Sequence, residues 1–198
     1  MNSKQTRYII LRKTPYHETS LILAGISSEY GRIDLLIRGA KKIGSKTLPA
    51  IDLFREIEIS INPKKEGLQT IYSAELVSNF DNIAMHKNSY LDSCEISRFI
   101  LRNSHPGIPS PLTYTSIRIA LQTLAISDKI LYSPMVKLVF LEEHGLLPRL
   151  PAHREEEIAL LEQLLSAAKG ESKMPELPTA YMKEIAEWIE SLCKYNEL

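Results

Sequence analysis

The stretch of sequence with the most evident chemistry is the basic segment RGAKKIGSKT at residues 38–47. It contains two glycines, no acidic residue and four cations, Arg38, Lys41, Lys42 and Lys46. A segment of this kind can hold a nucleoside triphosphate, neutralise a polymer of phosphates, or keep a loop in water. The spacing of its residues and the elements beside it decide between these uses.

The segment nearly matches the nucleotide-binding P-loop, G-x-x-x-x-G-K-[ST], in which the lysine directly follows the second glycine. Here Ser45 separates Gly44 from Lys46. A P-loop also leads into a helix whose first amides face the phosphates, whereas residues 51–61, IDLFREIEISI, alternate as a strand does. A nucleotide-dependent enzyme that uses Gly39–Thr47 is therefore the first alternative and not the favoured interpretation.

The other reactive side chains form no recognisable catalytic or metal-binding set. Cys94 and Cys193 lie far apart among apolar neighbours, which predicts buried free thiols in an intracellular protein. The histidines show no metal-ligand spacing, and they are His17, His86, His105, His144 and His153. No G-x-S-x-G nucleophile elbow is present. We expect no catalytic residue, no metal and no cofactor, and hence a protein that is not an enzyme.

The charge of the chain is balanced in total but divided along its length. The sequence holds 24 Lys and Arg residues and 24 Asp and Glu residues, so its formal net charge is zero. Residues 1–80 hold 12 basic and 8 acidic residues, whereas residues 81–198 hold 12 and 16. A basic amino-terminal part with an unopposed run of cations is suited to a polyanion such as nucleic acid.

The hydrophobic pattern of residues 1–80 has a period of two, which is typical of strands. Five segments show it: TRYIILRK, TSLILAGIS, RIDLLIRG, IDLFREIEISI and LQTIYSAELV. We expect His17 in the turn between the first two strands and Ser28–Gly31 in the next hairpin loop, with a positive φ at Gly31. Five strands without a covering helix leave exposed edges unless the sheet curls. The pattern therefore predicts a five-stranded oligonucleotide-binding (OB-fold) barrel.

After residue 80 the apolar period becomes helical and predicts a bundle of four or five helices over residues 81–198. The predicted helices cover about 85–103, start at Ser110-Pro111 and Ser133-Pro134, cover 155–168, and start near Thr179. The two serines are expected to cap their helices through their hydroxyl groups. The predicted fold class is α+β, with a barrel followed by an all-α domain.

The length and hydropathy of the chain are those of an ordinary globular protein. A chain of 198 residues buries about 70% of the surface of its unfolded state, enough for one core or two small ones. No apolar run is long enough to cross a bilayer, and the amino terminus lacks the pattern of a signal peptide. We therefore expect a cytoplasmic protein.

Three stretches, TPYHETSLIL, EYGRIDLLIRGAKKIGSK and LPAIDLFREIEI, carry a family resemblance. In order and spacing they resemble the P-Y-x-E turn, the x-G-R-I hairpin and the K-G-A-R-x-x-x-S-like basic segment of the bacterial RecO recombination mediators. The similarity continues in residue type through YSAELV, NSYLDSCEISRFIL and VKLVFLEEHGLLP. It thus covers roughly residues 7–148.

This resemblance implies a non-enzymatic mediator of DNA repair and homologous recombination. Such a protein binds single- and double-stranded DNA, anneals strands, and helps to load recombinase onto strands coated with single-strand binding protein, together with the partner RecR. The resemblance also implies association with the bacterial nucleoid. Two departures stand out: this chain has no cysteine in LPRLPAHREEE, where many relatives place a four-cysteine zinc module, and its carboxyl-terminal region is short.

Cations beside a barrel face neutralise the phosphates of a strand without selecting a sequence. The predicted DNA-binding residues are therefore the basic segment and one weaker neighbour: Arg38, Lys41, Lys42, Lys46 and Arg32. Four aromatic residues could stack on bases, although packing is favoured for each: Tyr16, Tyr30, Phe54 and Tyr72. The second alternative is a scaffold whose acidic helical half binds proteins and whose barrel does not contact DNA.

Overall fold

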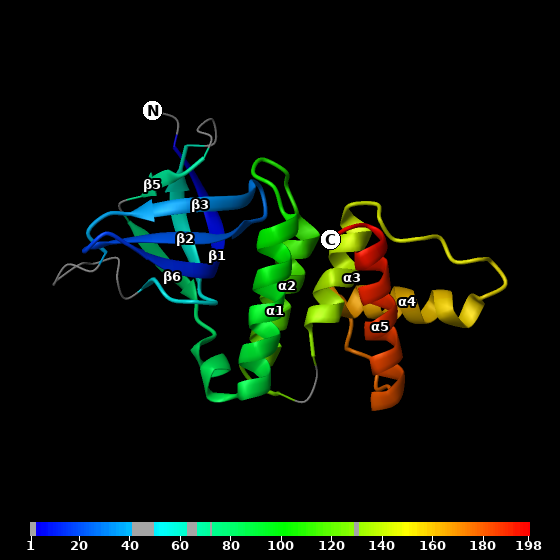
Figure 1. The fold of residues 1–198 in the computed structure, drawn as a ribbon. Coiled ribbons are helices and arrows are strands. Elements are labelled where there is room, and N and C mark those ends of the chain that lie inside the picture. Colours follow the sequence, from blue (N-terminus) through cyan, green and yellow to red (C-terminus); the bar gives the residue numbers. More distant parts are fainter. Residues whose placement is uncertain (1–2, 41–49, 63–66, 72, 129–130) are drawn as a thin grey trace.

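The computed structural model describes residues 3–40, 50–62, 67–71, 73–128 and 131–198. Within these residues a curled sheet of six strands comes first and five α-helices follow (Figure 1). The strands are β1 (Lys4–Tyr16), β2 (Ser20–Ser27), β3 (Gly31–Ile37), β4 (Glu56–Ile61), β5 (Gln69–Ile71) and β6 (Ala74–Ser78). The helices are the 3-10 helix η2 (Asp81–Met85), α1 (Lys87–Asn103), α2 (Pro111–Leu124), α3 (Ser133–Glu143), α4 (Glu155–Ala168) and α5 (Thr179–Tyr195). The predicted α+β class and order of elements are confirmed.

The sheet is built around the long strand β1. The strand order is β5-β3-β2-β1-β4-β6, and all neighbours are antiparallel except β3 and β5. The first half of β1 pairs with β4 and its second half pairs with β2, with a bulge between Ile10 and Arg12. A bulge bends a strand and increases its twist. This allows one strand to serve two neighbours in a curled sheet.

The prediction of a single fifth strand over residues 68–77 is wrong. The structure divides it into β5, which pairs with β3, and β6, which pairs with β4, at opposite ends of the strand order. Only residues 72 and 73 separate the two strands in sequence. One straight strand cannot pair with both β3 and β4. The predicted strand is therefore divided into two, each with its own neighbour. The described strands number six and not five, and their arrangement is compatible with an OB-like sheet.

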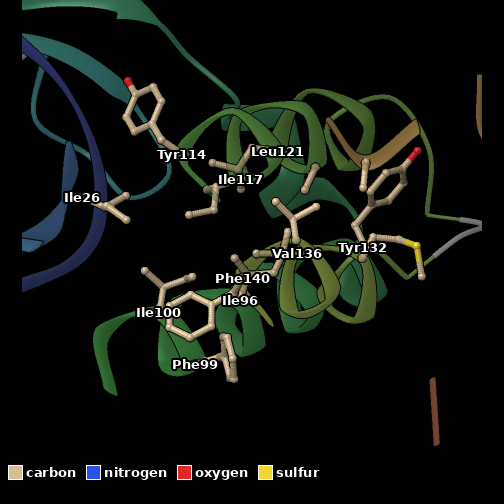
Figure 2. Packing of buried hydrophobic residues seen from close by; sticks show 14 of the residues in the cluster. Ile26, Ile96, Phe99, Ile100, Tyr114, Ile117, Leu121, Tyr132, Val136 and Phe140 are labelled. Carbon is tan, nitrogen blue, oxygen red and sulfur yellow. The ribbon is translucent and has the colours of Figure 1, made fainter. Parts of the chain in front are cut away.

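Alternating side chains give the sheet two apolar faces and hence two cores. The inner core contains Tyr8 and Ile10 of β1 and alternate residues of the other strands, such as Leu23, Leu35 and Ile57. The outer face contributes Ile9 and Ile26 to a larger core shared with the helices. Figure 2 shows Ile26 on the side of the sheet that faces residues of α1 and α2, such as Ile117. Sheet and helices are therefore stabilised by a common apolar cluster.

The helix starts were predicted at the right places, but their capping groups are different from those predicted. Neither Ser110 nor Ser133 makes a side-chain cap within the described residues. The amides at the start of α2 donate instead to the Glu143 carboxylate, at 2.8 and 2.9 Å, and those at the start of α3 donate to Asp92. A carboxylate satisfies free amides and complements the helix dipole. Because both acids lie on other helices, these caps also hold the helices together.

The β2–β3 hairpin is locked to the loop that connects α1 and α2. Gly31 has a φ of 62°, as predicted, and a Cβ there would lie 2.2 Å from the carbonyl oxygen of Ile108. The loop is held by backbone hydrogen bonds from Gly107 to Tyr30, 3.0 Å, and from Arg32 to His105, 3.4 Å. Only glycine satisfies both the backbone angle and the close approach.

A buried cation joins three helices. The Lys137 side chain on α3 is 4% exposed; its Nζ donates to Glu95 on α1 at 2.9 Å and to Glu190 on α5. Burial lowers the pKa of Lys137, but the two carboxylates outweigh it and the net pKa is raised. Burial likewise raises the pKa of Glu95, and the hydrogen bond and charge of Lys137 outweigh it, so the net pKa is lowered from 4.5.

We predict that Gly31→Ala lowers the free energy of unfolding by more than about 2 kcal/mol, because it adds a steric clash to the cost of a positive φ. Gly145→Ala is the matched control. Gly145 also has a positive φ, 68°, but a Cβ there meets nothing within 4 Å, so a loss of only about 1 kcal/mol is expected. Chemical denaturation measures both. Equal losses would contradict the proposed clash.

We predict that Lys137→Met lowers the free energy of unfolding at neutral pH by about 1–3 kcal/mol, because both carboxylates lose their partner while remaining partly hydrated. The pKa of Glu95 is depressed in the folded state, so its contribution is present above its ordinary pKa of 4.5 and is lost as the pH falls below that value. Denaturation between pH 7 and pH 3 should therefore show the deficit of the variant shrinking below about pH 4.5. A deficit that does not change with pH would rule out the ion pair as its source.

Candidate nucleic-acid interface

The outer face of β1–β3 is only half covered by helices. The pairing register places on this face Arg12, Thr14 and Tyr16 of β1, Ser20, Ile22, Ala24 and Ile26 of β2, and Arg32, Asp34 and Leu36 of β3. Ala24 and Ile26 are buried in the core shared with the helices, whereas Tyr16 and Arg12 are exposed. The open half of this face, ending at the β1–β2 turn, is the candidate interface.

At the open end of the face, Arg38 borders a hollow of about 370 Å³. The hollow is lined by Tyr16, His17, Thr19, Ser20, Leu36, Arg38 and Gly39. Arg38 is exposed and follows β3 directly, and no ion pair of Arg38 occurs among the described residues. A solvated guanidinium at the rim of a hollow is available to an anionic ligand.

Tyr16 is the aromatic residue best placed to meet a base. The residue is 40% exposed, and its ring packs edge to face on His17, with 4.1 Å between ring centroids. His17 lies in the β1–β2 turn, as predicted, with a φ of 50°. Phe54 is buried and Tyr30 is half-buried against the inner core, as their predicted packing roles require. Tyr72 lies outside the described residues.

Arg32 is engaged in contacts that join the sheet to α1. Its Nη1 donates to the carbonyl oxygen of Leu101 at 2.6 Å, and its Nη2 and Nε donate to Asp34 at 3.1 and 3.4 Å. Leu101 belongs to the last turn of α1, where unpaired carbonyl groups favour a cation. The geometry gives Arg32 a structural role, and its contribution to DNA binding stays a prediction.

The remaining predicted site residues, Lys41, Lys42 and Lys46, lie outside the described residues, so their roles stay predictions. The flank on the carboxyl-terminal side of the basic segment is described. Residues 56–61 form strand β4, and no α-helix occurs in residues 50–62. A P-loop needs a helix start beside its phosphates. The described flank therefore argues against nucleotide binding by Gly39–Thr47.

Other candidate chemistry is sparse in the part of the chain that the structure describes. There, no cluster of three or more His, Cys, Asp or Glu residues has the arrangement of a metal site. Both cysteines are free; Cys193 is buried, but Cys94 is partly exposed, contrary to the prediction of two buried thiols. No described helix combines the length and the apolarity needed to span a bilayer.

Comparison with known proteins relates the chain to one family. Residues 1–80 match the family described as Recombination protein O N terminal. The chain is 27% identical over 142 residues to the DNA repair protein RecO of Thermodesulfovibrio yellowstonii, an alignment that covers 71% of this chain and 55% of the relative. It is 35% identical over 74 residues to RecO of Polynucleobacter necessarius, covering 37% and 30%. It is 25% identical over 165 residues to RecO of Alteromonas mediterranea, covering 82% and 68%.

The chain thus spans about half or less of the length of the first two relatives. The family match covers the sheet, and the alignments of 142 and 165 residues are too long to be confined to it. The similarity therefore includes helical residues as well.

We predict that Arg32→Ala lowers the free energy of unfolding by about 1–3 kcal/mol, because it leaves Leu101 and Asp34 without a charged donor. Arg38→Ala is the matched control and should change stability by less than about 0.5 kcal/mol. Urea denaturation of the two variants measures the difference. Equal stability of the variants would contradict the structural role of Arg32.

Proposed function

Because residues 1–80 match the RecO amino-terminal family and longer alignments relate the chain to RecO proteins, we propose that it is a RecO-type protein that binds DNA and acts as a mediator of DNA repair and homologous recombination. The open half of the β1–β3 outer face is the proposed contact surface. The observation that carries the proposal is that Arg38, the first residue of the basic segment, lies with Tyr16 at the rim of one hollow. In OB folds, ligands bind over strands 2 and 3 and the adjoining loops.

The proposed site acts on the phosphates and not on the sequence of the bases. Arg38 and the lysines Lys41, Lys42 and Lys46 would neutralise successive phosphates and release their counterions. Tyr16 would offer a ring on which any base can stack. Such a surface binds both single and double strands, because both expose a phosphate backbone.

Strand annealing follows from the same electrostatics. Two single strands repel each other until cations on the protein reduce the repulsion, after which base pairing supplies the favourable free energy. No covalent bond is made or broken in this process. The proposed role is therefore that of a non-enzymatic mediator without a cofactor, and no residue is assigned a catalytic step.

The family resemblance supports two protein partners for this role. We include in the proposal RecR and single-strand binding protein, with the chain helping to load recombinase onto coated strands. The helical half has 16 acidic and 12 basic residues after residue 80. This excess of negative charge disfavours binding of a DNA backbone along the whole of that half. Individual surfaces of the helices remain available to partners.

We predict that single-stranded DNA binding weakens with salt with a slope of log K against log salt near −3, since about four neutralised phosphates contribute −0.7 each. Replacing Lys41, Lys42 and Lys46 with Glu should make the slope shallower and weaken binding at every salt concentration. Fluorescence anisotropy of a labelled oligonucleotide measures both. A flat slope for the native chain would reject the proposed site.

The matched control replaces Lys87, Lys173 and Lys194, three exposed lysines of the helical half, with Glu. It changes the net charge equally but should leave affinity within about twofold, because it leaves the sheet face unchanged. Equal losses in the two triple variants would show that net charge alone governs binding. No loss in the first variant would support the scaffold alternative, and ATP binding in calorimetry would revive the nucleotide-dependent alternative.

A further inference from the structure

A second hollow lies where β1 meets α1. It measures about 370 Å³, and its surface is formed mainly by apolar side chains. From the sheet side it is lined by Leu11, Arg12, Leu53 and Phe54, and from α1 by Cys94, Ser97, Arg98, Leu101 and Arg102. We call it the β1–α1 groove. The α1 residues lie three or four positions apart, so they form one continuous stripe of the helix.

The rim of the β1–α1 groove is cationic. Arg98 and Arg102 stand one helical turn apart on α1, and Arg12 lies on the opposite wall. Arg98 pairs with Glu95 of its own helix, whereas Arg12 and Arg102 have no ion pair among the described residues. All three arginine residues are exposed. An apolar floor between planar cations suits a flat, aromatic and anionic ligand.

The groove also has an aromatic neighbour and a tightly held floor. Tyr90 lies one turn before Cys94 on the same helix, is 40% exposed, and contacts the Phe54 ring edge to face at 6.0 Å. Phe54 adopts a φ of 61°, rare for a bulky residue, and its amide donates to the carbonyl oxygen of Ile10 at 2.9 Å. The floor is thus fixed by the same strand that carries Arg12.

The position of the groove relates it to the proposed DNA surface. Arg12 belongs to the β1–β3 outer face and also to the groove. A strand that lies along the open half of that face can therefore continue into the groove without leaving the protein. A closed cavity of about 150 Å³ holds benzene, so the groove has room for a flat nucleobase.

We propose that the β1–α1 groove seats an unpaired nucleobase of a single strand, stacked against the guanidinium planes of Arg12 and Arg102. This inference rests on the proposed DNA-binding function and names the ligand that the site prefers. A paired base is already stacked and hydrogen-bonded inside a duplex and cannot enter the groove. The groove therefore gives single strands an affinity that duplexes lack.

The test uses the full chain with Arg12→Lys and Arg102→Lys combined. Lysine keeps both charges but lacks the planar group that stacks on a base. Anisotropy titrations compare three probes: an oligothymidylate, an abasic oligonucleotide of the same length, and a duplex. We expect the affinity for oligothymidylate to fall at least about threefold, since one stacked base contributes about fivefold or more, while the other two affinities change less than about twofold.

Arg149→Lys, at an exposed arginine in the loop before α4, is the matched control and should change none of the three affinities. Equal losses for all three probes would overturn the inference, because they would show contacts to phosphate only. Unchanged affinities for all three would also overturn it and leave the groove to another occupant, such as an acidic peptide. Failure of the native chain to bind any probe would instead reject the proposed function.

Discussion

The packing of the β1–β3 outer face against α1 and α2 is the contact that organises the whole molecule. Ile9 and Ile26 enter a common apolar cluster with helical residues, so about half of this face is removed from water. The other half stays open and carries Arg38 and Tyr16. The same contact creates the β1–α1 groove at the boundary. Hydrophobic burial thus determines where the polar surface of the sheet is available.

Charged groups then fix the relative positions of the packed elements. Arg32 ties β3 to the end of α1, Glu143 and Asp92 satisfy the starts of α2 and α3, and Lys137 joins three helices. Each of these groups interacts with a helix terminus or an opposite charge. Such an interaction is stronger than a hydrogen bond between neutral groups. Three cations without an ion pair among the described residues, Arg12, Arg38 and Arg102, lie at the sheet face and the groove.

Much of the fold could be predicted from the sequence, but less of the site. The period of two located the strands and the helical period located all five described α-helices, because burial on one face imposes each period. The prediction that two serines cap their helices was wrong. The acids that cap these helices lie 31 and about 40 residues away in the sequence from the amides that they accept from. The division of the predicted fifth strand was missed because the local sequence pattern does not show where a strand changes its pairing partner. Arg38 is exposed, and its DNA-binding role stays a prediction, whereas Arg12 and Arg102, which line the β1–α1 groove, were not among the predicted site residues.

Three properties of this chain can be read from its residues alone: the order of strands and helices, the need for glycine at residue 31, and the concentration of positive charge before residue 50. They depend on neighbours along the chain and on backbone angles. The internal bonding of Arg32 and the orientation of Arg12 toward α1 are established only by folding. The bulge at Ile10 and Arg12 shifts the alternation of β1, and the helices then cover one part of its outer face and not another. Which part of the face is covered depends on contacts between residues distant in sequence, and such contacts leave no periodic signal in the sequence.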